Sequence, residues 1–173
     1  MPSLVVTLIG PDRPGLVGTV SDVVRRHEGN WRESRMAHLA GQFAGIVLVD
    51  VTADRSDALI HELQQLSSKG LKVVAELDVN PLPAVSGTVW SLNVVANDRP
   101  GIVREVTSVL TSHDVNVEEL TTECADAPLA GGQIFKAQAS IRVPEGLSVD
   151  LLQTELERLA TDLMTDFSPA TES

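Results

Sequence analysis

The chain has 173 residues, 43% of them apolar, and a formal charge of −11, so it encodes an acidic protein large enough for one ordinary domain or two small ones. This charge argues against direct contact with nucleic acid and against a basic membrane-binding helix. The single cysteine excludes an internal disulfide. The sequence shows no secretory signal and no apolar run long enough to span a membrane, so we expect a cytoplasmic protein.

An internal repeat organises the chain. The segment GPDRPGLVGTV at 10–20 returns as ANDRPGIVREV at 96–106, an offset of 86 residues. Of the 22 residues at 12–33, ten are identical to the residues 86 positions later. Farther on the offset grows to 92, as between Phe43 and Phe135. Such self-similarity indicates that one domain has been duplicated.

Strands and helices alternate in a fixed order in the first copy. Val5 to Ile9 is a β-branched run that predicts a buried strand. Asp-Arg-Pro-Gly follows, and we expect Asp12 to cap a helix whose apolar face includes Leu16 and Val17. The later elements expected are strands at 31–38 and 43–51 around a turn at Gly41, a helix beginning at Ser56, and a strand at 71–79.

The second copy repeats this pattern. We expect strands at 89–96, 117–123, 134–143 and 163–167, helices beginning at Ile102 and Ser148, and a turn at Gly131 and Gly132. The order βαββαβ, twice, predicts an α+β protein of two ferredoxin-like domains, each with both helices on one face of a four-stranded antiparallel sheet. The domains would cover 1–80 and 89–168, with a proline-containing linker at 81–88 and a frayed tail at 169–173.

The loop between the first strand and the first helix of each copy is the best candidate for a ligand site. A helix N-terminus offers unpaired N–H groups and a positive dipole end, which suit the carboxylate of an amino acid. Gly15 and Gly101 would let a ligand approach the backbone closely. The alternative is that the motif only starts the helix.

Other reactive side chains favour structural roles. His27 and His113 fall in the last turn of their helices, where an imidazole interacts favourably with the dipole. Glu123 and Asp126 flank Cys124 and should raise its pKa, which disfavours a nucleophilic role. The histidines do not have the spacing of metal ligands, so we expect no metal site. Since Cys124 is disfavoured as a nucleophile, we also expect no catalytic residue, and no motif of the chain indicates a cofactor.

The duplicated Asp-Arg-Pro-Gly motif, with an Asn at the start of the next strand, resembles the ACT domain, an amino-acid-sensing module. Two copies over 4–167, and the stretch NWRESRMAHLAG at 30–41, are similar to the glycine cleavage system transcriptional repressor family. In ligand-binding ACT domains the residue before Arg-Pro-Gly and the Asn after the first helix help to hold the effector. The resemblance therefore implies a site at Asp12, Arg13, Gly15, Leu16 and Asn30, and a second at Asp98, Arg99, Gly101, Ile102 and Asn116.

Two positions in each copy, the Asp and the Asn, can also be interpreted differently. Asp12 and Asp98 stand where such domains often have Asn; a carboxylate could hold an ammonium group but would repel a carboxylate. Asn30 and Asn116 could also serve as helix C-terminal residues with a left-handed backbone. We expect the first copy to be the better site. Trp31 follows Asn30 where the loop and the second strand should converge, and the formal charge is −2 over 1–86 against −9 over 87–173.

These features predict a non-enzymatic regulatory protein that binds a small effector, most simply an amino acid, and acts on another macromolecule. The family resemblance implies that the partner is a DNA-binding transcriptional regulator. The alternatives are a scaffolding oligomer that has lost the ligand, and an enzyme, for which the chain offers no acid–base or nucleophile constellation. We expect a homodimer, because isolated domains of this fold leave an edge strand and a sheet face open; a monomer with internally paired copies is the alternative.

Overall fold

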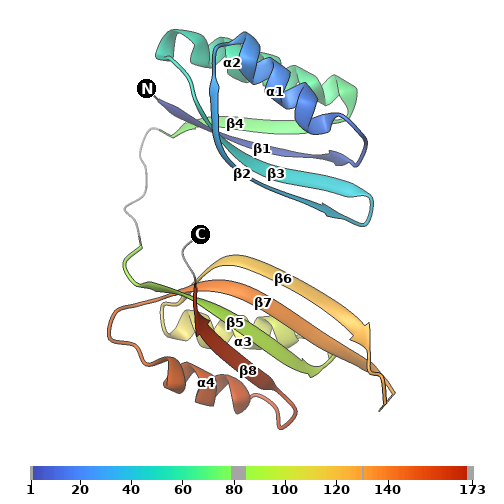
Figure 1. The fold of residues 1–173 in the computed structure, drawn as a ribbon, viewed down its shortest axis with the longest axis vertical. Helices are drawn as coiled ribbons and strands as arrows, with labels where there is room; N and C mark the ends of the chain where they lie inside the picture. The colour runs from blue at the N-terminus through green and yellow to red at the C-terminus, as the bar shows by residue number, and fades with distance from the viewer. Residues whose placement is uncertain (1, 79–84, 130, 171–173) are drawn as a thin grey trace. The chain divides into compact units, whose positions relative to one another are not determined.

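A computed structural model describes residues 2–78, 85–129 and 131–170. The chain divides into two units, Met1–Leu82 and Pro83–Ser173, and each has the same succession of strands and helices (Figure 1). No helix in the described residues is long and apolar enough to cross a membrane.

The first unit is a four-stranded sheet with two helices on one face. The sheet order is β2-β3-β1-β4, and all neighbouring strands are antiparallel. Along β1, Leu4, Val6 and Leu8 are buried, whereas Val5 and Ile9, which point to the other face of the sheet, are exposed. The elements are β1 (Ser3–Pro11), α1 (Leu16–Arg26), β2 (Asn30–Leu39), β3 (Gln42–Asp50), α2 (Ala53–Gln65), the short 3-10 helix η1 (Leu66–Lys69) and β4 (Lys72–Asp78).

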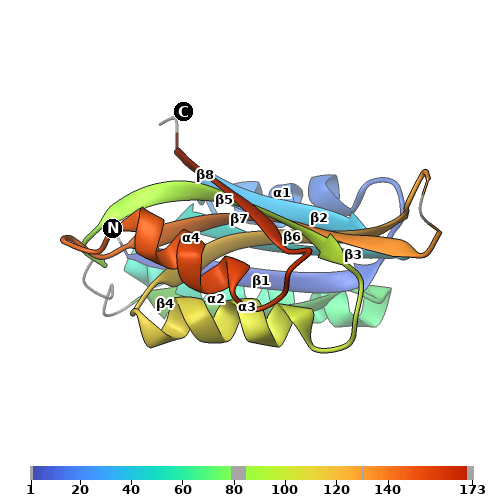
Figure 2. The same ribbon diagram turned by 90° about the horizontal axis from the view of Figure 1, so that it is seen from below.

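The second unit repeats this topology. Its sheet order is β6-β7-β5-β8, again antiparallel, and α3 and α4 both lie across one face (Figure 2). Each unit has its own hydrophobic core between helices and sheet. The prediction of two ferredoxin-like α+β units is therefore confirmed. The elements are β5 (Thr88–Asn97), α3 (Ile102–Ser112), β6 (Asn116–Asp126), β7 (Gln133–Val143), α4 (Val149–Glu157) and β8 (Met164–Pro169).

The first helix of each unit buries a narrower face than the sequence pattern predicts. In α1 the buried residues are Leu16, Val20, Val23 and Val24, whereas Val17 is 43% exposed. Its counterpart in α3, Val103, is 42% exposed. The predicted inclusion of Val17 in the core-facing stripe is wrong, because it lies at the margin of that stripe, as Val103 does in α3.

Helix α2 begins at Ala53, three residues before the predicted start at Ser56. Ser56 is buried inside the helix, where its hydroxyl donates to the carbonyl of Ala53 at 2.9 Å. Because this hydroxyl is satisfied within the helix, Ser56 does not act as the cap, and Thr52 occupies the N-cap position. In the second unit Ser148 precedes α4 as predicted.

The predicted linker and tail fall only partly within the described residues. Of the linker 81–88, residues 81–84 lie outside them, and Thr88 already belongs to β5. In the tail, residues 171–173 lie outside, and Pro169 is the last residue of β8. The Ala170 N–H also donates to the carbonyl of Val89 at 3.1 Å, so the sheet extends past the predicted domain limit at 168.

Candidate functional site

The loops that carry Asp-Arg-Pro-Gly end in the same way in both units. Gly15 and Gly101 are the N-cap residues of α1 and α3, with φ of 88° and 90°. A side chain at either position would meet nothing within 4 Å, so glycine is required by the backbone conformation and the space above it is open. Neither helix has a side-chain cap, although in α3 the N–H of Ile102 donates to the carbonyl of Arg99 at 3.4 Å.

The aspartates of the motif connect each loop to a hairpin through their backbone. The N–H of Asp12 donates to the carbonyl of Gly41, and that of Asp98 to the carbonyl of Gln133, each at 2.9 Å. Because Gly15 and Gly101 take the cap positions three residues later, the aspartate side chains do not cap the helices. The capping role predicted for Asp12 and Asp98 is wrong.

In the first unit the arginine of the motif has no carboxylate partner among the described residues. Arg13 donates to the carbonyl of Lys69 at the end of η1. Among the described residues, no carboxylate lies within ion-pair distance of Arg13, so its remaining N–H groups are available to an anion. Asp12 lies 3.5 Å from the imidazole of His38, near the end of β2. The loop therefore carries a cation and an anion that point to different sides of β1: Arg13 toward η1 and β4, and Asp12 toward the end of β2.

In the second unit the corresponding arginine is already neutralised. Arg99 donates to both carboxylate oxygens of Glu105 in the first turn of α3, at 2.8 and 2.5 Å. This pair raises the pKa of Arg99 and lowers that of Glu105. A second carboxylate, Asp162, accepts the backbone N–H of Asn97 at 2.7 Å. An incoming carboxylate would meet two anions here, so this loop is the poorer site for it.

Cys124 occupies in β6 the position that His38 has in β2. Its pKa is raised by desolvation and then by the neighbouring carboxylate of Asp98. The predicted direction of this shift is confirmed, but the carboxylate responsible is Asp98 and not Glu123 or Asp126. Among the described residues no group of three or more His, Cys, Asp or Glu side chains lies close enough to hold a metal ion.

Asn30 and Asn116 lie far from the loops of their own units. Asn30 is opposite Asp50 at one end of β3, whereas the loop meets the other end, beside Gln42. Eight residues of strand separate the two places, about 25 Å. The hypothesis that Asp12 and Asn30 converge on one site within a unit is therefore wrong, and the same register separates Asp98 from Asn116.

Trp31, the next residue of β2, lies at the same distant end as Asn30. It is paired with Val49 and packs against the core of the first unit, so it does not border the loop. A binding role for Asn30 or Asn116 stays a prediction, and it requires a partner other than the loop of the same unit.

Sequence reasoning missed the side chains that distinguish the two loops. His38 and Glu105 lie 26 and six residues from their partners Asp12 and Arg99. One signal was present: at the offset of 86, His38 aligns with Cys124 and Glu105 with Thr19, so the copies differ at both positions. Those differences alone do not say which side chains approach the loop.

Comparison with known proteins identifies the domain family. Two family models, each described as an ACT domain, match residues 3–76 and 90–160. The chain belongs to the ACT-domain family. Each of its units is one ACT domain, and the loop described above joins the first strand to the first helix of that domain.

Some similar proteins match nearly the whole chain and others match less than half of it. The chain is 26% identical over 163 residues to the glycine cleavage system transcriptional repressor of Escherichia coli, covering 92% of this chain and 85% of that protein. It is 38% identical over 74 residues to the UPF0237 protein MK1213 of Methanopyrus kandleri, covering 42% of this chain and 82% of that one. The crystal structure of an unknown protein from Galdieria sulphuraria is similar with a TM-score of 0.84 and 30% identity, over 98% of this chain and 99% of that one.

Proposed function

We propose that this tandem ACT protein is a non-enzymatic regulator that binds an amino acid at the β1–α1 loop of its first domain. The observation that carries the proposal is the different pairing of the two motif arginines. Within the described part of the chain Arg13 donates to a carbonyl and has no carboxylate partner, so it can receive one, whereas Arg99 is held by Glu105. The uncapped N-terminus of α1 adds amide donors for the same carboxylate.

The other end of an amino acid is matched by Asp12. Its carboxylate is 40% exposed and faces His38, so it can accept the α-ammonium group. This arrangement supports Asp12, Arg13, Gly15 and Leu16 as the residues around the effector. It also gives a reason for Asp at a position where the resemblance suggested Asn, because the anion pairs with ammonium while Arg13 pairs with carboxylate.

The downstream role is proposed from the kind of protein that the chain is similar to. The Escherichia coli relative is a transcriptional repressor, and the strong negative charge of this chain disfavours direct contact with DNA. We therefore propose action in the cytoplasm through a protein partner, a DNA-binding regulator, with the effector altering that association. A scaffold of the same fold without a ligand is the alternative.

The binding step is tested by isothermal titration of the full chain with each of the twenty amino acids. We expect at least one to bind, and Arg13→Gln to weaken it about 10- to 100-fold, the effect of losing one charge-assisted hydrogen bond. The matched control is Arg99→Gln in the second domain, which should leave the affinity unchanged.

Two outcomes would contradict the proposal. Binding that survives in Arg13→Gln but is lost in Arg99→Gln would place the site in the second domain. Absence of binding by all twenty amino acids would favour the scaffold.

A further inference from the structure

A row of polar side chains crosses the face of the second sheet that has no helices, its helix-free face. Asn93 of β5 is paired with Gln138 of β7 on one side and with Asp166 of β8 on the other, and Gln138 is paired with Thr121 of β6. The residues before and after Asn93 in β5 are buried in the core. Because successive side chains of a strand alternate between faces, Asn93 and the residues level with it point to the helix-free face.

The surface over this row is hollowed. The hollow has a volume of about 300 Å³, at the lower end of the range of small-molecule pockets. Asn93, Thr121 and Gln138 line it, and Asn93 is half-buried there. The side chain of Val95 also borders the hollow.

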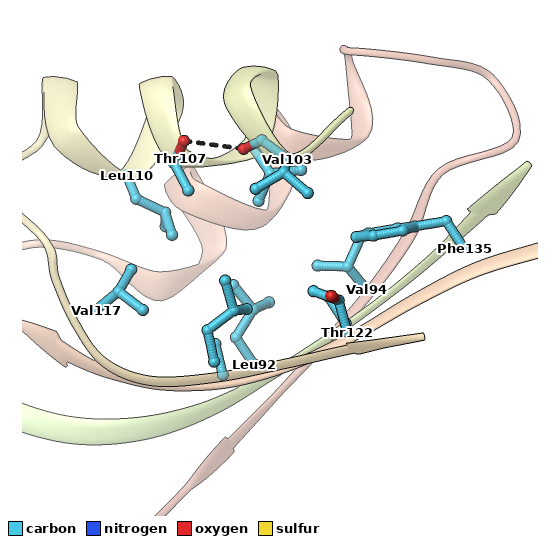
Figure 3. A pocket seen from close by; sticks show the side chains of 12 residues that line it. Leu92, Val94, Val103, Thr107, Leu110, Val117, Thr122 and Phe135 are labelled. Carbon is cyan, nitrogen blue, oxygen red and sulfur yellow. Dashed lines mark hydrogen bonds between the residues drawn. The ribbon is translucent and has the colours of Figure 1, made fainter. Parts of the chain in front are cut away.

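The cavity on the other side of the same sheet is of a different kind. It lies between α3 and the sheet, with Val103 and Leu110 on the helix side and Leu92, Val117 and Phe135 on the sheet side (Figure 3). Its volume is about 20 Å³, enough for one water-sized group, and nearly all of its wall is apolar. That cavity is too small for a ligand, unlike the hollow on the helix-free face.

The polar groups of the row keep their capacity for hydrogen bonds. Within the described part of the chain, the side chains of Asn93, Thr121 and Gln138 have no hydrogen-bond partner. Each amide offers two N–H donors and a carbonyl acceptor, and the threonine hydroxyl can donate and accept. Neighbouring strands are about 5 Å apart, so the row presents donors and acceptors at that spacing.

The residue types of the row differ from those that strands favour. Asn and Asp are depleted in strands, whereas Val and Thr are enriched. At the offset of 86 Asn93 corresponds to Thr7, and Asp166 beside it stands where the first sheet has Val74. The second sheet thus carries polar groups of low strand propensity at two adjacent positions where the first sheet has good strand formers, and a binding role gives a reason for them.

From the hollow and its unpartnered polar groups we infer that the second domain binds an uncharged small molecule with adjacent hydroxyl groups, of the sugar or polyol class. A hydroxyl both donates and accepts, so neighbouring hydroxyls match amides that lie side by side, and Val95 contacts the C–H groups. Lys136, which also lines the hollow, is paired with Glu123 at 3.7 Å, and Asp166 adds a negative charge to the row, so an anion would be repelled. The site belongs to the second domain, and the inference does not depend on the amino acid proposed for the first.

Glucose, ribose and myo-inositol are the probes, and NMR of the side-chain amide groups of the full chain gives the readout. We expect saturable shifts of the amide signals of Asn93 and Gln138 with at least one of the three. Asn93→Thr and Gln138→Ile introduce the residues that the first sheet has at these places, and each should weaken binding about 3- to 10-fold, the effect of losing one neutral hydrogen bond. The matched control is Thr7→Val in the first sheet, which should leave the affinity unchanged.

Three results would overturn the inference. One is the absence of saturable shifts at both amides in the unmodified protein with any of the three probes up to about 50 mM. Another is an equal response to tetrahydropyran, which has a ring without hydroxyl groups. The third is unchanged affinity in both Asn93→Thr and Gln138→Ile, each shown by its spectrum to be folded. The titration of the unmodified chain decides the question even where a variant does not fold.

Discussion

A histidine at the end of the first helix of each domain is hydrogen-bonded to a glutamate of the second helix. His27 lies 2.6 Å from Glu62, and His113 lies 2.7 Å from Glu155. Both histidines were predicted to interact with the dipole of their own helix, but the contact that orients each ring is a carboxylate on the neighbouring helix. In the first domain Arg26 also pairs with Glu62, so one carboxylate connects α1 and α2 at two points.

This carboxylate makes the stability of the first domain depend on pH. Hydrogen bonds from His27 and then Arg26 lower the pKa of Glu62 below its ordinary value of 4.5. The folded state therefore binds fewer protons than the unfolded chain, and the stabilisation is present above pH 4.5 and lost as pH falls through the lowered value. Glu62→Gln should cost less than about 1 kcal/mol at pH 5, because the carboxylate is a third exposed, and the cost should shrink toward pH 3.

Urea unfolding between pH 3 and 5, followed through signals from the core of the first domain, measures this difference in the free energy of unfolding. The matched control is Glu76→Gln, which alters an exposed carboxylate of β4 that has no ion-pair partner among the described residues. A cost for Glu62→Gln that stays constant or grows as pH falls would contradict the assignment.

At the scale of elements, the end of β1 lies so close to the loop before β4 that a residue larger than glycine does not fit there. Gly10 lies at the end of β1, and a Cβ there would come within 2.6 Å of the carbonyl oxygen of Gly70, just before β4. Backbone atoms at that distance cannot yield as a flexible side chain can. Gly18 in α1 is the opposite case, since a Cβ there would meet nothing within 4 Å.

The two glycines therefore predict opposite effects of the same substitution. Gly10→Ala should lower the free energy of unfolding by about 1–3 kcal/mol, the usual cost of overpacking. Gly18→Ala should raise it by about 0.5–1 kcal/mol, because alanine is the better helix former in an exposed helix. Chemical unfolding of both variants checks this, and a stable Gly10→Ala protein would show that η1 and the following loop can move away from β1.

For the whole molecule, the two sheets present unlike surfaces on the faces without helices. The first exposes Val5, Ile9, Ile46 and Val74, with Ile46 and Val74 on either side of Thr7. In the second sheet, Asn93 takes the place of Thr7, and it is flanked by Gln138 and Asp166 where the first sheet has Ile46 and Val74. Apolar side chains at such positions favour association, whereas amide and carboxylate groups are well hydrated.

This contrast indicates which surface would join the two copies of the predicted homodimer, namely the helix-free face of the first sheet. If the apolar face of the first sheet joins two copies, Ile46→Asp should shift sedimentation from the dimer to the 18.5 kDa monomer at tens of micromolar protein. The matched control is Leu151→Asp, a substitution of a leucine 43% exposed on α4 in the second domain. Sedimentation of the unmodified chain as an 18.5 kDa species would contradict the dimer itself.

The sequence by itself determined the repeat, the type and order of the elements, and the loop at which each helix begins. These features follow from local signals: alternation of apolar residues in strands, the 3.6-residue period of helices, and turn residues at glycine and proline. Local signals also placed the strand ends to within a few residues, but they misplaced the start of α2, because Ser56 is a helix-capping residue type that is here satisfied inside the helix.

The tertiary structure alone decided which side chains meet. Arg13 reaches Lys69, 56 residues away, while Arg99 pairs with Glu105, so two loops with the same motif have different charge. Sheet register places Asn30 at the end opposite the loop, and the packing of α3 on the second sheet leaves a small apolar pocket, whereas Trp31 packs against the core of the first domain. Such contacts depend on which residues of distant elements lie level with one another, and that is fixed only when strands pair and helices pack.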